Sequence, residues 1–132
     1  MKTSLFFILM CFVATFAVQA QKTDKNKDKV FTEVDEQPVY PGGEEALFKF
    51  ISDNVKYPVK AQEKGIQGKV YVEFIIDKTG TVTQAKISRS VDTDLDNESL
   101  RVVKLLKKWT PGKVEGKPVN VKYTLPISFA LS

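Results

Sequence analysis

The sequence predicts an α+β domain in which a three-stranded antiparallel sheet packs against two helical segments. Two observations indicate the sheet: apolar and polar residues alternate over 68–77 and again over 119–129, with the period of a half-buried strand. A third observation indicates the helices, because apolar residues recur at spacings of three and four before and between these stretches. With 132 residues, the chain is long enough for one domain of this kind.

Residues 1–20 are typical of a secretory signal peptide. Lys2 supplies a positive charge, Leu5 to Val18 form an uncharged apolar stretch, and Val18-Gln19-Ala20 resembles a cleavage site. An uncleaved membrane anchor is the alternative, but the fourteen residues of this stretch rise only about 21 Å as a helix, against a hydrocarbon core of roughly 30 Å. We therefore expect export to the periplasm, with no stable membrane anchor after cleavage.

The mature chain is expected to begin with a polar tail. Cleavage would remove Cys11, the only cysteine, and leave neither a thiol nor a disulfide. Residues 21–29 contain no apolar side chain and are expected to be a solvated tail. Residues 30–132 have the composition of a packed domain, which could begin with a short strand over 30–34.

Two helices are predicted before the first long strand. Proline and glycine residues interrupt the chain between 38 and 43, and a helix follows over 44–54, with apolar side chains at i, i+3 and i+4 from Leu47. Pro58 is expected to stand at the first position of a second, shorter helix that ends at Gly65.

A β-hairpin is predicted next. Its first strand spans 68–77 and has its apolar side chains on one face, and a turn containing Gly80 leads into the returning strand, 81–88. The apolar period of the second strand breaks once, which predicts a bulge near Thr83 or Gln84.

One long helix and one long strand complete the predicted domain. The helix is expected from Asp94 to Trp109, with Asp94 or Asp96 as its N-cap. The strand is expected over Val119–Phe129. It contains Pro126, which has no N–H to donate and therefore predicts a free edge or a bulge at that point.

The residue types exclude several classes of function. The chain has no histidine, so histidine acid–base catalysis, serine–histidine–aspartate triads and histidine metal sites are excluded. Asp92, Asp94 and Asp96 lack the glycine and the downstream glutamate of a calcium loop, and helix capping accounts for them better. Glu73 and Asp77 could pair for acid–base chemistry, but exposed strand positions usually carry charge for solubility. We predict no enzyme, with no catalytic residue, cofactor or metal ligand.

The net charge gives little reason to expect a nucleic-acid partner. It is +4, and the charges are interspersed along the chain.

The last predicted strand is the element that indicates most about function. Nothing that follows it in the sequence would cover its outer edge, and an uncovered edge presents unpaired N–H and C=O groups. Lys122 and Pro126 could simply blunt this edge. The other two outcomes are addition of an extended partner peptide as a further strand, and self-pairing into a homodimer.

Four short motifs stand at fixed places along the chain. They are Tyr57-Pro58-Val59-Lys60-Ala61, Gly65-Ile66-Gln67-Gly68-Lys69-Val70, Asp77-Lys78-Thr79-Gly80 and Pro126-Ile127-Ser128-Phe129. In this order and spacing they resemble the TonB C-terminal domain family, and the resemblance covers about residues 30–131. The lead-in over 39–43 resembles versions from Bacteroidetes-type bacteria.

The resemblance implies a periplasmic peptide-binding module linked to transmembrane transport. Such a domain binds the TonB box, a short segment of outer-membrane TonB-dependent transporters, by adding it to the last strand of the domain. The contacts expected along this strand are Val119, Val121, Lys122, Tyr123, Leu125, Ile127 and Phe129. In the family, a basic residue just after the Tyr-Pro pair touches the transporter, and Lys60 occupies that place.

The sequence departs from full energy transducers of this family in two ways. Those proteins carry a membrane anchor with a histidine and a long proline-rich spacer, whereas this chain has no histidine and a lead of only nine residues, 21–29. Fully extended, that lead reaches about 30 Å. We therefore expect a stand-alone exported domain that binds without driving transport itself. The alternative is an assembly domain that homodimerises, or binds envelope components, through the same edge.

Overall fold

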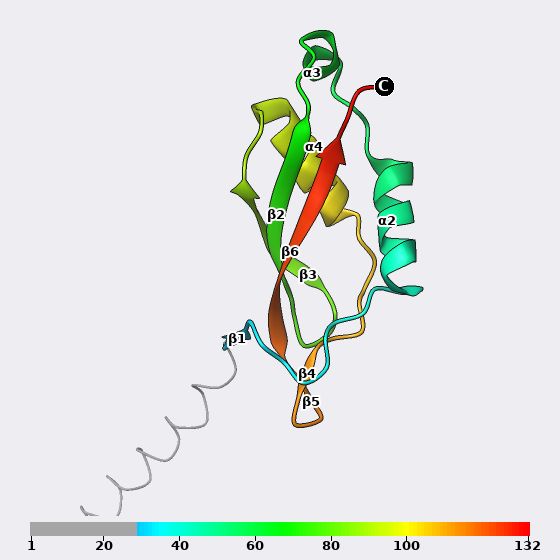
Figure 1. Ribbon diagram of the computed structural model, residues 1–132. Coiled ribbons are helices and arrows are strands. Elements are labelled where there is room, and N and C mark those ends of the chain that lie inside the picture. The colour runs from blue at the N-terminus through cyan, green and yellow to red at the C-terminus, as the bar shows by residue number, and fades with distance from the viewer. Residues whose placement is uncertain (1–28) are drawn as a thin grey trace, which may run out of the picture.

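A computed structural model describes residues 29–132 (Figure 1). The predicted signal peptide and all but the last residue of the predicted tail lie outside the described residues. The elements are β1 (Val30–Phe31), α2 (Gly43–Asn54), α3 (Val59–Glu63), β2 (Gly68–Ile76), β3 (Val82–Arg89), α4 (Thr93–Lys104), β4 (Lys113–Val114), β5 (Lys117–Pro118) and β6 (Asn120–Phe129). The predicted α+β class is confirmed.

The main sheet has four strands in the order β1-β6-β2-β3. Its three long strands pair antiparallel, as predicted, with β2 in the centre. The fourth strand, β1, covers two residues of the short strand considered over 30–34 and pairs parallel with β6, which makes the sheet mixed. Strands β4 and β5 form a separate hairpin. The fourth strand could not be predicted as part of the sheet, because two residues are too few to show the alternation of a strand.

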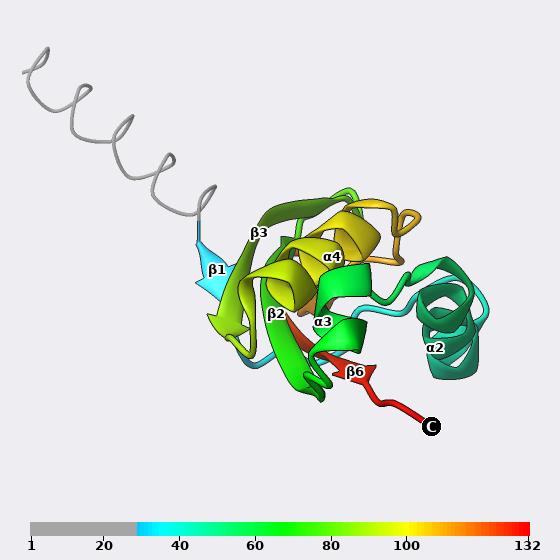
Figure 2. The same cartoon turned by 90° about the horizontal axis from the view of Figure 1, so that it is seen from above.

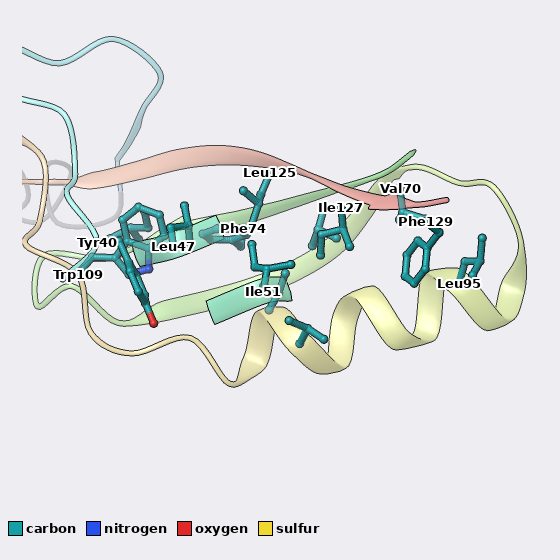
Figure 3. Packing of buried hydrophobic residues seen from close by; sticks show 14 of the residues in the cluster. Tyr40, Leu47, Ile51, Val70, Phe74, Leu95, Trp109, Leu125, Ile127 and Phe129 are labelled. Atoms are coloured by element: carbon teal, nitrogen blue, oxygen red, sulfur yellow. The ribbon is translucent and has the colours of Figure 1, made fainter. Parts of the chain in front are cut away.

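The hydrophobic core lies between the sheet and the helices. Figure 2 shows α3 and α4 over one face of the sheet, with α2 beyond β6. Alternate residues of β2 and β6 point into this core because side chains along a strand alternate between its two faces. Figure 3 shows several of the side chains that meet there. The buried set includes Leu47, Ile51, Val70, Val72, Phe74, Ile76, Leu95, Val102, Val103, Leu125, Ile127 and Phe129.

Helix α4 begins and ends earlier than the sequence predicts. Its N-cap is Asp92, whose carboxylate accepts hydrogen bonds from the main-chain N–H groups of Asp94 at 3.0 Å and Leu95 at 3.4 Å. The predicted caps, Asp94 and Asp96, lie inside the helix. The helix ends at Lys104 rather than Trp109, because the main-chain N–H of Trp109 donates to Gly80 and that of the next residue to Val39.

Trp109 is part of the hydrophobic core and lies on the segment that follows α4, not at the end of the helix. Its side chain is 4% exposed and packs edge-on against Tyr40, with ring centroids 5.3 Å apart. It also packs against Phe74 at 6.1 Å and Tyr123 at 5.1 Å. The apolar spacing that predicted a longer helix therefore reflects burial of the ring on an extended segment.

Two smaller predictions concern the short helix and the hairpin. Helix α3 begins at Val59, and Pro58 is its N-cap rather than its first residue. The bulge predicted near Thr83 or Gln84 is confirmed, because β3 has one residue more than β2 at this place and Gln84 has a φ of 51°. A second register shift in β3 leaves Ser88 without a partner across the ladder.

Candidate functional site

The outer edge of β6 is the candidate site. Strand β6 pairs with β2 over nine consecutive residue pairs without a register shift, from Gly68 opposite Phe129 to Ile76 opposite Val121. On the other side of β6, β1 covers only Asn120 and Val121. Within residues 29–132 no other strand pairs with that side of β6, so the edge beyond Lys122 is not paired with any strand.

The main-chain groups that face this edge follow from the hydrogen-bond alternation. Asp77 donates its main-chain N–H to Thr81, across the hairpin, and the carbonyl of Ile75 accepts from the Thr83 hydroxyl, so odd-numbered residues of β2 face β3. Even-numbered residues of β2 then face β6, where their partners are odd-numbered. The even-numbered residues of β6 must turn their N–H and C=O groups outward.

Pro126 fits this alternation. It is even-numbered, so its nitrogen lies on the outer edge, where the missing N–H removes nothing from the ladder with β2. The outward groups between β1 and the end of the strand are the N–H and C=O of Thr124 and Ser128 and the C=O of Pro126. All three side chains are exposed on the open face of the sheet.

These residues were missed by the sequence reasoning, which selected mainly odd-numbered positions. Four of the predicted contacts point their side chains into the core: Val121, Leu125, Ile127 and Phe129. Their main-chain groups pair with β2. Pro126 is the signal that could have identified Thr124 and Ser128. A proline in a paired strand has its nitrogen on the side where no hydrogen-bond donor is needed, and residues two positions away turn their main-chain groups to the same side.

The remaining predicted contacts lie in three different places. Tyr123 is half-buried on the helix side of the sheet, and Lys122 is exposed on the open side. Val119 lies just before β6 and donates its N–H to the carbonyl of Gly112 at 2.9 Å. Lys60 is exposed on α3, near the end of the sheet where Tyr57 packs edge-on against Phe129 at 5.5 Å. The structure therefore groups Lys122 and Tyr123 at the edge, with Lys60 beyond the end of β6.

Glu73 forms ion pairs with two lysines on the open face of the sheet. The Glu73 carboxylate lies 3.0 Å from the Lys122 ammonium and 3.2 Å from that of Lys86. Hydrogen bonds from these two lysines hold the pKa of Glu73 below its usual range. Glu73 is thus an ionised partner in a strand-to-strand bridge.

Asp77, the other carboxylate considered for acid–base chemistry, shapes the hairpin turn. It accepts from the Thr79 N–H at 2.9 Å, the Thr79 hydroxyl at 2.6 Å and the Thr81 N–H at 3.0 Å. Burial works to raise the pKa of Asp77, but these hydrogen bonds outweigh it and lower the pKa. Its position is accounted for by the turn.

The opposite edge of the sheet is a poorer template. Strand β3 contains two register shifts, at Gln84 and Ser88, and bulges disrupt the regular spacing that an added strand would need. Strand β6 has none against β2. Of the two edges, β6 is the one suited to strand addition.

Among residues 29–132, no group of three or more acidic, cysteine or histidine side chains could hold a metal ion. In the same range, no helix is long and apolar enough to cross a membrane.

The chain is similar to known proteins of one family. Residues 53–131 match the family model of the Gram-negative bacterial TonB protein C-terminal region. The chain is 33% identical over 113 residues to Protein TonB of Helicobacter pylori, which covers 82% of this chain and 38% of that relative. It is 34% identical over 77 residues to Protein TonB of Vibrio cholerae, which covers 58% of this chain and 31% of the relative. The chain thus spans less than two fifths of the length of these curated relatives.

The fold agrees with a solved member of the same group. The solution structure of the Helicobacter pylori TonB C-terminal domain superposes with a TM-score of 0.51 at 27% identity, covering 65% of this chain and 78% of that one. The family match, which spans more than half of the chain, and this likeness lead to one conclusion: the chain belongs to the TonB C-terminal domain family.

Proposed function

We propose that this chain is a periplasmic, non-enzymatic module that binds the TonB box of outer-membrane TonB-dependent transporters and thereby serves transmembrane transport. The observation that carries the proposal is the uncovered, bulge-free outer edge of β6 in a domain of the TonB C-terminal family. The box segment would add beside Thr124, Pro126 and Ser128 as a further strand. Each main-chain hydrogen bond gained there would contribute about 0.5–1.5 kcal/mol.

The proposal includes the organisation of the chain. Residues 1–20 would direct export and be cleaved, residues 21–29 would form a solvated lead, and residues 30–132 would be the binding domain. Lys60 would contact the transporter outside the box, because it is exposed beyond the end of β6.

A titration of the mature chain tests this function. Isotope-labelled residues 21–132 would be titrated with TonB-box peptides from transporters of the same cell, and amide shifts would be followed by NMR. We expect saturable shifts concentrated on Thr124 to Ser128. A folded spectrum without shifts at millimolar peptide would overturn the proposal.

Self-assembly through the same edge is the competing outcome. Sedimentation of the mature chain separates the two, because a tight dimer that protects the amides of Thr124 and Ser128 would leave no edge for a box peptide. We expect a monomer whose edge amides exchange with solvent until peptide is added.

A further inference from the structure

Helix α2 stands beside the outer edge of β6, and residues of both elements line two separate cavities. Figures 1 and 2 both place α2 next to β6, on the side away from β2. The helix is anchored by Leu47 and Ile51, which are 1% and 7% exposed. The family match begins at residue 53, so nearly all of α2 precedes it. The α2 residues that line the cavities, Glu44, Leu47, Phe48, Ile51 and Ser52, thus lie outside the matched region.

One cavity between α2 and β6 has a mainly apolar lining. It has a volume of about 500 Å³ and is bounded by Phe48, Ile51, Ser52 and Val55 on the helix side and by Pro126, Ile127 and Ser128 on the strand side, with Lys69 of β2 beside them. Phe48 is 47% exposed, although it is a large apolar side chain next to this cavity. A large apolar side chain of a bound peptide would cover Phe48 and remove apolar area from water.

The second cavity has an aromatic lining with one carboxylate. It has a volume of about 390 Å³, and its lining includes the rings of Tyr40, Trp109 and Tyr123 and the side chain of Glu44. Burial, followed by the charge of Glu44, raises the pKa of Tyr123, which places that negative charge close to the ring. Within residues 29–132, no lysine or arginine pairs with Glu44. Tyr40 and Trp109 are each only 4% exposed, so the groups of this cavity that a cation could contact are the half-buried ring of Tyr123 and the Glu44 carboxylate.

The spacing of the two cavities matches an extended chain. Tyr123 and Ile127 are four residues apart on the same face of β6, which corresponds to about 13 Å along a strand. A strand added to β6 would direct the side chains of residues i and i+4 to the helix side, one into each cavity.

We propose that β6 and α2 together select an extended peptide with a lysine or arginine side chain for the Tyr123 cavity and, four residues away, a large apolar side chain for the Ile127 cavity. This inference rests on the proposed function, since it specifies the segment that would add to β6. Charge complementarity at Glu44 and the exposed ring of Phe48 determine the two preferences.

Labelled nine-residue peptides test the two preferences on mature chain 21–132. A threonine–valine host peptide would be compared with two derivatives that carry lysine and phenylalanine four residues apart, in either order, by fluorescence anisotropy. We expect one order to bind about tenfold more tightly than the host, and that order also gives the strand direction. Equal binding of host and derivatives would overturn the inference.

Matched variants assign each preference to its residue. Glu44→Gln should abolish the gain from lysine, whereas Glu45→Gln, the exposed neighbour that does not line the cavity, should leave it unchanged. Glu44→Lys should transfer the preference to a peptide with glutamate in place of lysine. Phe48→Ala should abolish the gain from phenylalanine, and Val59→Ala, which removes apolar atoms from an exposed side chain of α3, should not. The Glu44 variants test the inference even if Phe48→Ala does not fold. If both Glu44→Gln and Glu44→Lys still preferred the lysine peptide, the inference would be wrong.

The outcomes also separate this inference from the function on which it rests. Host and TonB-box peptides that bind regardless of Glu44 and Phe48 would overturn the inference and leave the proposed function standing. A folded chain that binds neither class of peptide would overturn both.

Discussion

Pro126 lies opposite Tyr71 in the ladder between β6 and β2, and its nitrogen is directed away from that ladder. The missing N–H therefore costs the fold nothing and instead interrupts the row of donors on the outer edge. A partner strand would find donors at Thr124 and Ser128, with only an acceptor between them. The edge is therefore partly blunted, which is one of the three outcomes that the sequence leaves open, and it keeps the donors and acceptors that the proposed partner strand requires.

The turn at Gly80 is predicted to tolerate no side chain. Its φ is +87°, and a Cβ added there would lie 1.8 Å from the carbonyl oxygen of Trp109. The main-chain N–H of Trp109 also donates to the carbonyl of Gly80 at 2.8 Å. We expect Gly80→Ala to lower the free energy of unfolding by about 2–4 kcal/mol. Denaturant unfolding measures this. Gly65→Ala is the control, because Gly65 has a φ of +70° and open space around it, and it should cost only about 1 kcal/mol. Equal losses in the two variants would show that contact with Trp109 is unimportant.

Asp92 is predicted to be the residue that starts α4. Its side chain accepts from two free N–H groups of the first turn, so Asp92→Ala should cost about 1 kcal/mol of stability. Asp94→Ala removes a similar charge near the helix N-terminus without removing the cap, and should cost a few tenths of a kcal/mol. Thermal unfolding of the two variants distinguishes them. A larger loss of stability in Asp94→Ala than in Asp92→Ala would indicate that Asp94 is the N-cap, as the sequence predicts.

Glu98 is predicted to make stability depend on pH in the acidic range. Its carboxylate binds Arg101 through two oxygens, at 2.7 and 2.8 Å, and accepts from the main-chain N–H of Lys56, and Arg101 also donates to the carbonyl of Asn54. The hydrogen bond from Arg101 is the main cause of the lowered pKa of Glu98, against an opposing effect of burial. A carboxylate with a lowered folded-state pKa stabilises the fold above its ordinary pKa and loses this contribution as the pH falls through the folded value.

The measurement is the stability difference between the wild type and Glu98→Gln as a function of pH. We expect about 1–2 kcal/mol at pH 7, shrinking as the pH falls below about 4. A difference that stays constant from pH 7 to pH 3 would contradict this account.

The sequence predicts well those elements in which apolar side chains recur at a regular spacing. The alternation along β2 and β6 and the glycine at the hairpin turn fix three long strands, and the same alternation identifies the core face. The prediction from apolar spacing fails at the end of α4. The spacing continues to Trp109, but the chain there is not helical because main-chain hydrogen bonds join it to Gly80 and Val39. Those partners are distant in sequence, so no local pattern contains them.

The candidate site was only partly predictable for the same reason. The sequence identifies the last strand and its proline, and hence an edge. Pro126 also indicates which residues face that edge, because Thr124 and Ser128 lie two positions away from it on the same strand. The position of α2 could not be predicted, because α2 stands beside the edge only where Leu47 and Ile51 pack into the core.

The central claim is that the outward main-chain groups of β6 bind an extended segment. The measurement that tests it most directly is the affinity of a TonB-box peptide for the Thr124→Pro and Thr124→Ala variants of the mature chain. Proline removes an outward N–H without touching the ladder to β2, so both variants should remain folded, with thermal midpoints close to each other. We predict that Thr124→Pro weakens binding about tenfold or more and that Thr124→Ala stays within about twofold of the wild type. A folded Thr124→Pro variant that binds as tightly as the wild type would contradict the account.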